Sequence, residues 1–479
     1  MSDLKLLPDV RRRLEALGQE RVLQWWDMLD QDGQPRLLAQ LDSIDFDAVG
    51  SLLEKLQYES PTEEDSDDKA LAAKPPANVV RLPESAVDYA RWNRARERGR
   101  ELLAEGRVGA ILVAGGQGSR LGFDHPKGMY PIGPVSGHSL FQIFAEQLLT
   151  RSRQCGQSIP YFIMTSDATH DETVSFFQLH NNFGLPADCV TFFRQGNMPA
   201  VECVPSDGRT RRILLSDRGT IALSPDGHGG MISALRNAGL LEQMRDRGIE
   251  HVYYHQVDNP TATVCDPAFI GFHLQAMSDM STRVVRKRHP DERMGAVVDL
   301  HGHTEIIEYS ELTPETSTRT DSDGTPVFWA GSTAIHMFRR EFLETIAADP
   351  SSLPFHLARK NVPYLDDSGN TLCLDDPDNP NALKFEQFIF DALPRAKSAL
   401  VLEADRAREF NPVKNRSGDD SPETARQAML RLGREWLEQS GLPIADDVRI
   451  EIGPLYGLSA DDVRDRLRNG LSGGLYFES

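Results

Sequence analysis

The 479-residue sequence is poor in cysteine and lacks long apolar runs, and each shortage excludes a class of protein. Its five cysteines are scattered and form no C-x-x-C pair, so a structural zinc site is not expected. They are Cys155, Cys189, Cys203, Cys265 and Cys373. An odd, scattered set is typical of a reducing cytoplasm, where most such thiols are small core residues.

No apolar run reaches the roughly 18 residues that a membrane-spanning helix needs. The first residues, MSDLKLLPDVRRRLEAL, also lack the uninterrupted apolar stretch of a signal peptide. We therefore expect a cytoplasmic protein with no membrane partner.

Positive charge is scarce as well, with 52 Lys and Arg against 72 Asp and Glu, for a formal net charge of −20. A nucleic-acid binder needs a basic surface to displace counterions, so this balance argues against that class and against binding to an anionic membrane. An acidic protein can still bind a small polyanion if basic side chains gather locally in a cleft.

The pattern along the chain predicts three consecutive parts. Residues 1–100 form a helical region, because apolar residues recur at helical spacing up to about residue 58 and again in AVDYARWNRARERGRELLAEG. The acidic stretch 59–69 between them is interpreted as a solvated linker, and Trp25–Trp26 as packing residues. Residues 101–395 form an α/β domain, and 396–479 a small C-terminal domain.

In the α/β part, short apolar runs alternate with helical patterns, which predicts βα units and a mixed, mostly parallel, Rossmann-like sheet. A single helix is expected over MISALRNAGLLEQMRDRG. Ligands of such sheets bind beyond the carboxyl ends of the strands. Four predicted strands end in glycine or polar pairs, which predicts one shared site: Gly115–Gly116, Thr165–Ser166, Gln195–Gly196 and Asp258–Asn259.

A glycine-rich turn, AGGQGSRLG, follows the first of these strands and is followed closely by Pro126-Lys127-Gly128. Glycines allow close backbone approach, and successive N–H groups can form an anion-binding nest. Arg120 offers a planar fork for phosphate oxygens and Lys127 a point charge. The turn is not a P-loop, since GxxxxGK[ST] is absent, and it fails the dinucleotide pattern GxGxxG, because Leu121 stands where the last glycine should be.

The string LVAGGQGSRLGFDHPKGMY resembles the nucleotide-binding signature of the UDP-sugar pyrophosphorylases. The resemblance continues in the family's order through YFIMTSD, FFRQGNMPA, SPDGHGG, HVYYHQVDNP, EYSEL, LKFEQFIFD and FNPVKN. It covers about residues 10–430 and is nearest to the eukaryotic-type UDP-N-acetylglucosamine branch. It implies a nucleotidyltransferase domain of the GT-A-like type, between a helical N-terminal part and a small C-terminal domain.

The resemblance also implies the roles of individual residues. Arg120, Lys127 and Lys414 would act on the phosphates as the catalytic cations. UTP would be bound by Val113, Ala114, Gly115, Gly116, Lys127, Gln195, Gly227, Asp258 and Lys384. The sugar phosphate would be bound by His228, Gly295, Glu308, Tyr309, Ser332 and Lys414.

The implied reaction joins UTP and a sugar 1-phosphate into a UDP-sugar and pyrophosphate. The attacking phosphate oxygen is already anionic, so positioning and cations carry the chemistry and no activated Ser, Cys or His is needed. Mg²⁺ is expected mainly on phosphate oxygens, with Asp258 as its protein ligand. The His-containing strings SPDGHGG and HGHTE receive no metal role, and the second, with His301 and His303, is expected to form a hairpin turn.

Two departures from the acetylglucosamine pattern fall on predicted sugar residues. His228 stands in place of an asparagine, and Trp329 and Ser332 replace the asparagines of FNAGN. N-acetylglucosamine 1-phosphate is the first expectation, with glucose 1-phosphate or a broader range as the alternative. Two hypotheses from other classes stay open: an inactive UDP-sugar-binding relative, and an NAD(P)-dependent oxidoreductase, which the failed fingerprint disfavours. The sequence leaves the oligomeric state open.

Overall fold

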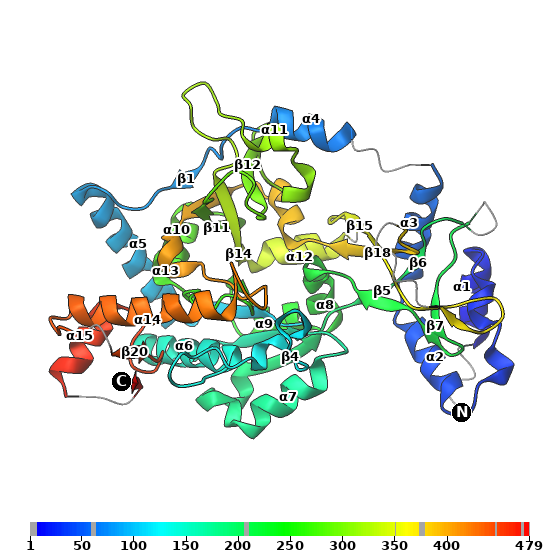
Figure 1. Cartoon of the computed structure of the whole chain (residues 1–479), viewed down its shortest axis with the longest axis horizontal. Coiled ribbons are helices and arrows are strands. Elements are labelled where there is room, and N and C mark those ends of the chain that lie inside the picture. The colour runs from blue at the N-terminus through cyan, green and yellow to red at the C-terminus, as the bar shows by residue number, and fades with distance from the viewer. Residues whose placement is uncertain are drawn as a thin grey trace. The chain divides into compact units, whose positions relative to one another are not determined.

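The structure, a computed structural model, describes residues 7–58, 64–205, 210–349, 351–372, 379–445, 448–470 and 474–478. The chain divides into two compact units whose segments alternate along the sequence (Figure 1). Unit 1 contains residues 1–65, 195–234 and 349–391, and unit 2 contains 66–194, 235–348 and 392–479. Among the described residues, no helix is both long and apolar enough to cross a membrane.

Unit 2 is built around a mixed sheet with the strand order β1-β19-β11-β14-β10-β2-β3-β4. Strands β10, β2, β3 and β4 are mutually parallel, as are β11, β19 and β1, whereas β14 is antiparallel to both of its neighbours. The strands are β1 (Val79–Val80), β2 (Val108–Val113), β3 (Tyr161–Thr165), β4 (Val190–Arg194), β10 (His251–Gln256), β11 (Met280–Arg286), β14 (Ala330–Arg339) and β19 (Ala399–Glu403). A hairpin of β12 (Ala296–Leu300) and β13 (His303–Ile307) extends from β14.

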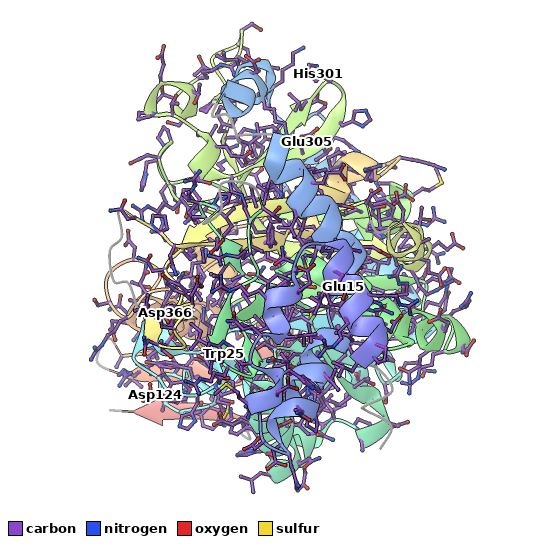
Figure 2. All side chains as sticks on the ribbon, turned by 90° about the vertical axis from the view of Figure 1, so that its right-hand side faces the viewer. Glu15, Trp25, Asp124, His301, Glu305 and Asp366 are labelled. Atoms are coloured by element: carbon purple, nitrogen blue, oxygen red, sulfur yellow. The ribbon has the colours of Figure 1, made fainter. Side chains whose placement is uncertain are left out.

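The predicted parallel strands form because their residues are apolar on both faces, as buried strands require. All five residues of β3 are buried, and so are the first five of β2. The predicted turn at HGHTE is confirmed as the turn of the β12–β13 hairpin, with His301 at its tip (Figure 2). His301 and Gly302 both have positive φ there.

The helices of unit 2 begin where the sequence supplies caps. Ser85 and Ser139 accept hydrogen bonds from backbone N–H groups in the first turns of α5 and α6, as N-caps do. The main helices are α5 (Ala86–Ala104), α6 (Leu140–Cys155), α7 (His170–Leu179), α9 (Leu240–Asp246), α10 (Pro267–Gln275), α11 (Pro314–Ser317), α12 (Arg340–Ala348) and α13 (Arg406–Glu409). The C-terminal segment adds α14 (Pro422–Gln439), β20 (Arg449–Ile452), α15 (Ala460–Arg468) and β21 (Leu475–Glu478), which share a small core of their own.

Unit 1 combines the N-terminal helices with short strands from two later segments. Its helices are α1 (Leu7–Ala16), α2 (Gly33–Asp42) and α3 (Phe46–Tyr58). Its strands are β5 (Asn197–Pro199), β6 (Val201–Glu202), β7 (Leu215–Asp217), β8 (Thr220–Ile221), β9 (Leu223–Pro225), β15 (Phe355–Lys360), β16 (Tyr364–Leu365), β17 (Thr371–Leu372) and β18 (Ala382–Gln387). One apolar core joins them and includes Trp26, Val201 and Phe385. Trp25 packs at the edge of the same core, which confirms the packing interpretation of the tryptophan pair.

Two local predictions are wrong. The linker expected over 59–69 contains most of a helix, α4 (Glu64–Ala72), which buries Ala70 in an apolar cluster of unit 2; residues 59–63 lie outside the described part. The single helix expected from Met231 is two, α8 (Met231–Asn237) and α9, because Gly239 between them has φ of +68°. The two units also divide the chain differently from the three consecutive parts, at 1–100, 101–395 and 396–479, that the sequence pattern indicates.

Candidate active site

The glycine-rich turn after β2 is a closed loop held by its own backbone. Gly118 N–H donates to the His125 carbonyl at 2.9 Å, and Lys127 N–H donates to the Gly116 carbonyl at 3.1 Å. A side chain at Gly118 would collide with Phe123, because an added Cβ would lie 2.7 Å from that residue's carbonyl oxygen. At Gly116, by contrast, an added Cβ meets nothing within 4 Å. The loop therefore presents open backbone at Gly116, as close approach of a phosphate requires.

Three of the four predicted strand ends meet at this loop. The Ser166 hydroxyl, just after β3, donates to the Gly115 carbonyl at 2.8 Å. Val257 N–H, just after β10, donates to the Val113 carbonyl at 3.1 Å, which places Asp258 beside the start of the loop. These contacts are those expected where a ligand binds beyond the carboxyl ends of parallel strands. Gln195 directly follows β4 in the chain but belongs to unit 1.

A distant segment joins the same edge of the sheet. Val413 N–H donates to the Asp258 carbonyl at 2.7 Å, and Lys414 is the next residue. The ammonium of Lys414 lies 5.5 Å from the centre of the Phe410 ring. About 155 residues separate these two positions in the sequence, so no local pattern could have paired them; only the family resemblance named both.

The predicted phosphate-binding cations of this region form no ion pairs. Within the described residues, Arg120, Lys127 and Lys414 have no carboxylate within ion-pair distance, and Arg120 is exposed while both lysines are half-buried. A fourth basic residue that the sequence reasoning missed, Arg416, lies against the loop, with its guanidinium carbon 3.6 Å from the Cβ position of Gly122. Unpaired positive charge beside an open glycine loop suits a polyphosphate, despite the net charge of −20.

Asp258 is the carboxylate predicted to contact magnesium. It is half-buried, and its side chain takes part in no hydrogen bond or ion pair with the described residues. A carboxylate left open next to a phosphate loop fits the way Mg²⁺ is usually held, by one or two carboxylates together with substrate phosphates. In the described part of the chain no group of three or more His, Cys, Asp or Glu could hold a metal by itself.

The predicted sugar residues of unit 2 converge around the β12–β14 contact. Ser332 N–H donates to the Gly295 carbonyl at 2.8 Å. A Cβ added to Gly295 would lie 2.6 Å from a carboxylate oxygen of Glu308, so the glycine makes room for that side chain. Tyr309 follows Glu308 and is 45% exposed. The structure thus brings Gly295, Glu308 and Ser332 together from three separate sequence segments.

Trp329 has a packing explanation instead. It is 6% exposed and belongs to an apolar cluster with Val284 and Val401. Arg81 stacks on its ring with the guanidinium carbon 3.8 Å from the ring centre, and Arg286 approaches it at 5.4 Å. This departure from the family pattern therefore fills a core position between two arginines.

In unit 1, two of the predicted UTP-binding residues, Gln195 and Gly227, lie next to a buried residue, Asp226. Its backbone N–H donates to the Gly196 carbonyl at 3.0 Å, and its side chain is hydrogen-bonded to Gln195. Added Cβ atoms at Gly196 and Gly230 would lie within 2.4 Å of the Asp226 carboxylate, so both glycines are required by its position. Burial raises the pKa of Asp226 to about 7, against the smaller opposite effect of its hydrogen bonds. The sequence reasoning did not select Asp226.

The neighbouring Gly227 and His228 pack against the end of β18. Gly227 has φ of +86°, and an added Cβ would lie 2.4 Å from the Gln387 carbonyl oxygen. The His228 ring is stacked near Phe388, with 5.4 Å between ring centres, and its Nδ1 accepts a hydrogen bond from Ile389 N–H at 3.1 Å. Burial lowers the pKa of His228 to about 4, with a smaller contribution from the nearby His356.

These contacts fix the protonation state and the tautomer of the His228 ring. A neutral ring whose Nδ1 accepts a hydrogen bond carries its proton on Nε2, so the second nitrogen is a donor at neutral pH.

Lys384, a predicted UTP-binding residue of unit 1, lies on β18 opposite Ala358 of β15. It is half-buried and forms no ion pair with any described residue.

A Rossmann-like sheet, an open glycine loop and unpaired cations at the strand ends define an enzyme of the nucleotidyltransferase class. A family model described as "UTP--glucose-1-phosphate uridylyltransferase" matches residues 59–430. The chain belongs to this family.

The relatives and solved structures agree with that assignment. The human "UDP-N-acetylhexosamine pyrophosphorylase-like protein 1" is 36% identical over 91% of this chain and 87% of its own. The "UDP-N-acetylglucosamine pyrophosphorylase" of Saccharomyces cerevisiae is 35% identical over 93% of this chain and 94% of its own. A crystal structure described as "putative UDP-N-acetylglucosamine pyrophosphorylase from Entamoeba histolytica" superimposes with a TM-score of 0.71 at 30% identity, over 82% of this chain and 96% of that one.

Proposed function

We propose that the protein transfers the uridylyl group of UTP to N-acetylglucosamine 1-phosphate, releasing pyrophosphate and UDP-N-acetylglucosamine. The observation that carries the proposal is the set of three unpaired cations, Arg120, Lys127 and Lys414, around the open loop at Gly116 and the free carboxylate of Asp258. These three cations form no ion pairs within the described residues, and their positive charge is complementary to the negative charge of a triphosphate.

In the proposed reaction, a phosphate oxygen of the sugar phosphate attacks the α-phosphorus of UTP. The bond from the α-phosphorus to the oxygen that bridges to the β-phosphorus breaks, and pyrophosphate leaves with that electron pair. Lys127 and Arg120 hold the triphosphate against the loop and neutralise the charge that develops on the leaving group, while Lys414 holds the sugar phosphate. Asp258 would hold Mg²⁺, which would supply further neutralisation of that charge. The roles of Gln195, Gly227 and Lys384 on the uridine and phosphates remain predictions.

The choice of sugar rests on the names of the relatives and on the cluster in unit 2. The human and yeast relatives are named for N-acetylhexosamine and N-acetylglucosamine, whereas the family model is described by glucose. Gly295, Glu308 and Ser332 offer a carboxylate and a hydroxyl that can bind sugar hydroxyls. Because Ser332 and His228 replace asparagines of the acetylglucosamine pattern, glucose 1-phosphate is the alternative substrate.

We also propose the cytoplasm as the compartment. Cys155, Cys189, Cys203 and Cys265 are all free thiols, which suits a reducing environment.

The test is pyrophosphate release from UTP and Mg²⁺ with a panel of sugar 1-phosphates, using purified full-length protein. We expect the highest kcat/KM with N-acetylglucosamine 1-phosphate. A preference for glucose 1-phosphate would keep the chemistry and overturn the proposed sugar. Binding of UDP-sugar without release from any sugar phosphate would overturn the enzyme and favour a binding protein.

A further inference from the structure

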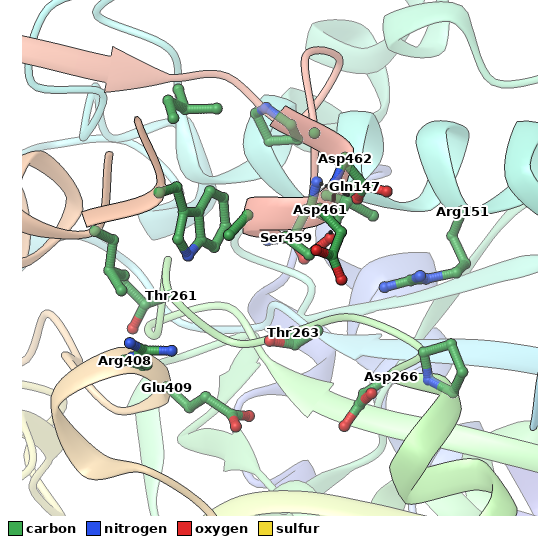
Figure 3. A pocket seen from close by; sticks show the side chains of 18 of the residues that line it. Gln147, Arg151, Thr261, Thr263, Asp266, Arg408, Glu409, Ser459, Asp461 and Asp462 are labelled. Carbon is green, nitrogen blue, oxygen red and sulfur yellow. Dashed lines mark hydrogen bonds between the residues drawn. The ribbon is translucent and has the colours of Figure 1, made fainter. Parts of the chain in front are cut away.

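A cavity lies in unit 2, and none of its lining residues is one that the proposed function uses. Its volume is about 660 Å³, within the range of small-molecule sites. It is lined by the helices α5, α6 and α14, by residues 260–268 at the start of α10, and by residues 451–462 of the C-terminal segment (Figure 3). All of these elements belong to unit 2.

Arg151 of α6 points into this cavity (Figure 3). Only 8% of the residue is exposed. One guanidinium nitrogen, Nη1, donates to Gln154 Oε1 at 2.9 Å, but Nε is buried without a hydrogen-bond partner. Within the described residues Arg151 forms no ion pair. A buried guanidinium that lacks a carboxylate is costly unless a ligand completes its hydrogen bonds.

The carboxylates that act most strongly on Arg151 are those of Asp266 and Asp462, and Asp266 is already engaged elsewhere. Asp266 and Glu409, which both line the cavity, bind the guanidinium of Arg283, which is 1% exposed. Their two charges are therefore shared with a buried cation. Burial lowers the pKa of Arg151, and the nearby carboxylates of Asp266 and Asp462 offset this effect only in part.

Three other carboxylates of the wall have partners, and a further one, Glu97 of α5, is exposed. Glu451 accepts hydrogen bonds from the backbone N–H groups of Val135 and Ser136 at 2.8 and 2.7 Å. Asp461 pairs with Arg464 at 2.8 Å. Asp462 accepts from the N–H of Leu458 at 2.9 Å. Among the described residues that line the cavity, Arg151 is thus the buried cation that lacks a carboxylate partner.

Two further arginines of α5 add to it. Arg96 and Arg100 line the cavity and form no ion pair within the described residues; Arg96 donates only to Asn93 Oδ1, at 2.6 Å. The rest of the lining includes the apolar surfaces of Trp92, Trp436 and Leu432. A lining that combines charged donors with indole rings is complementary to a ligand with an anionic group on a flat apolar body.

We propose that this cavity binds a small aromatic anion, with its phosphate or carboxylate on the guanidinium of Arg151. The cavity wall continues directly from Asp258: Asn259 Nδ2 donates to the Glu409 carbonyl at 2.7 Å, and Pro260 and Thr261 line the cavity. The ligand would therefore occupy a position next to the nucleotide loop and separate from it. The proposal does not rest on the proposed function.

The test is calorimetric titration of the full-length protein with phenyl phosphate and, separately, with phenylacetate, each in the presence of saturating UDP. Benzyl alcohol is the uncharged match. At least one anion is expected to bind at one site while benzyl alcohol does not, and the stronger anion identifies the group that Arg151 holds. No binding of either anion, binding equal to that of benzyl alcohol, or binding abolished by UDP would overturn the proposal.

Arg151→Met should raise the Kd for the anion at least about tenfold, as expected for the loss of a charge-assisted hydrogen bond. The matched control is Arg153→Met, two residues along the same helix and exposed, which should leave binding unchanged. Thermal melting monitors the fold of both variants. If Arg151→Met does not fold, Arg96→Gln on the cavity rim tests the same point and should also weaken binding. Unaltered affinity in the folded Arg151 variant, or in Arg96→Gln if it alone folds, would overturn the assignment.

Discussion

Asp226 gives the chain a stability cost that depends on pH. The residue is 9% exposed, one carboxylate oxygen has no hydrogen-bond partner among the described residues, and its pKa is raised to about 7 from an ordinary 3.8. The folded state therefore keeps a proton between about pH 4 and pH 7 that the unfolded state releases. Because the folded state binds more protons in this window, stability falls as pH rises through it. At about 1.36 kcal/mol per pH unit, the penalty above pH 7 is of the order of 4 kcal/mol, an upper value.

Asp226→Asn removes the charge while keeping the shape of the side chain. We expect the variant to be more stable than the parent at pH 8, by up to about 4 kcal/mol, and the difference to shrink towards zero near pH 4. Urea denaturation at pH 4.5, 6 and 8 measures it, since pH is the only variable. The control is Asp32→Asn, at an exposed position in the same unit, which should show no such trend. A stability gain from Asp226→Asn that is equal at all three pH values, or a loss that grows with pH, would refute the reasoning.

Three further outcomes follow from the contacts. Lys127→Met should lower kcat/KM for UTP by about a hundredfold to a thousandfold, with an unchanged melting temperature, because Lys127 forms no ion pair with the described residues. The control in the pyrophosphate assay is Lys360→Met, at an exposed position. Arg283→Met should cost about 3–5 kcal/mol in urea denaturation, because it leaves two carboxylates unpaired in the interior. Gly295→Ala should raise the KM for the sugar phosphate and leave that for UTP unchanged, because the new methyl group displaces the Glu308 carboxylate; equal effects on both substrates would contradict the assignment.

The parallel half of the sheet was predictable because its signal is local. Strands β2, β3 and β10 are short apolar runs that end in glycine or polar residues, and both features are visible in one stretch of sequence. The direction of β14 was not predictable, since an apolar strand has the same pattern whether its neighbours run parallel or antiparallel. The break at Gly239 depends on a positive φ, and a glycine inside a helical pattern does not reveal its φ.

The site residues likewise fall into those that a local sequence pattern reveals and those that it does not. The glycine loop and its cations carry a recognisable pattern, so Arg120 and Lys127 were found from spacing. Lys414, Glu308 and Lys384 carry no local signal, and only the resemblance selected them. Arg416 and Asp226 were missed because their importance comes from tertiary contacts: one lies against Gly122, and the other is enclosed by two glycines. Arg151 was missed for the same reason, since a basic residue in an amphipathic helix ordinarily faces water.

His228, which departs from the family motif, has a structural role of its own, because its ring contacts the end of β18. The histidine Nδ1 is occupied by the N–H of Ile389, and the ring is stacked near Phe388, so one side of it anchors the glycine loop of unit 1 to the end of β18. An asparagine has no ring to stack there, so the two residues would hold the loop differently. Only Nε2–H is left to meet a ligand, and it is a donor, whereas an asparagine amide can also accept. If His228 touches the sugar, it therefore selects for an acceptor oxygen at that point. Replacing it with asparagine should then change the ratio of kcat/KM between N-acetylglucosamine 1-phosphate and glucose 1-phosphate, and an unchanged ratio would assign His228 to the loop alone.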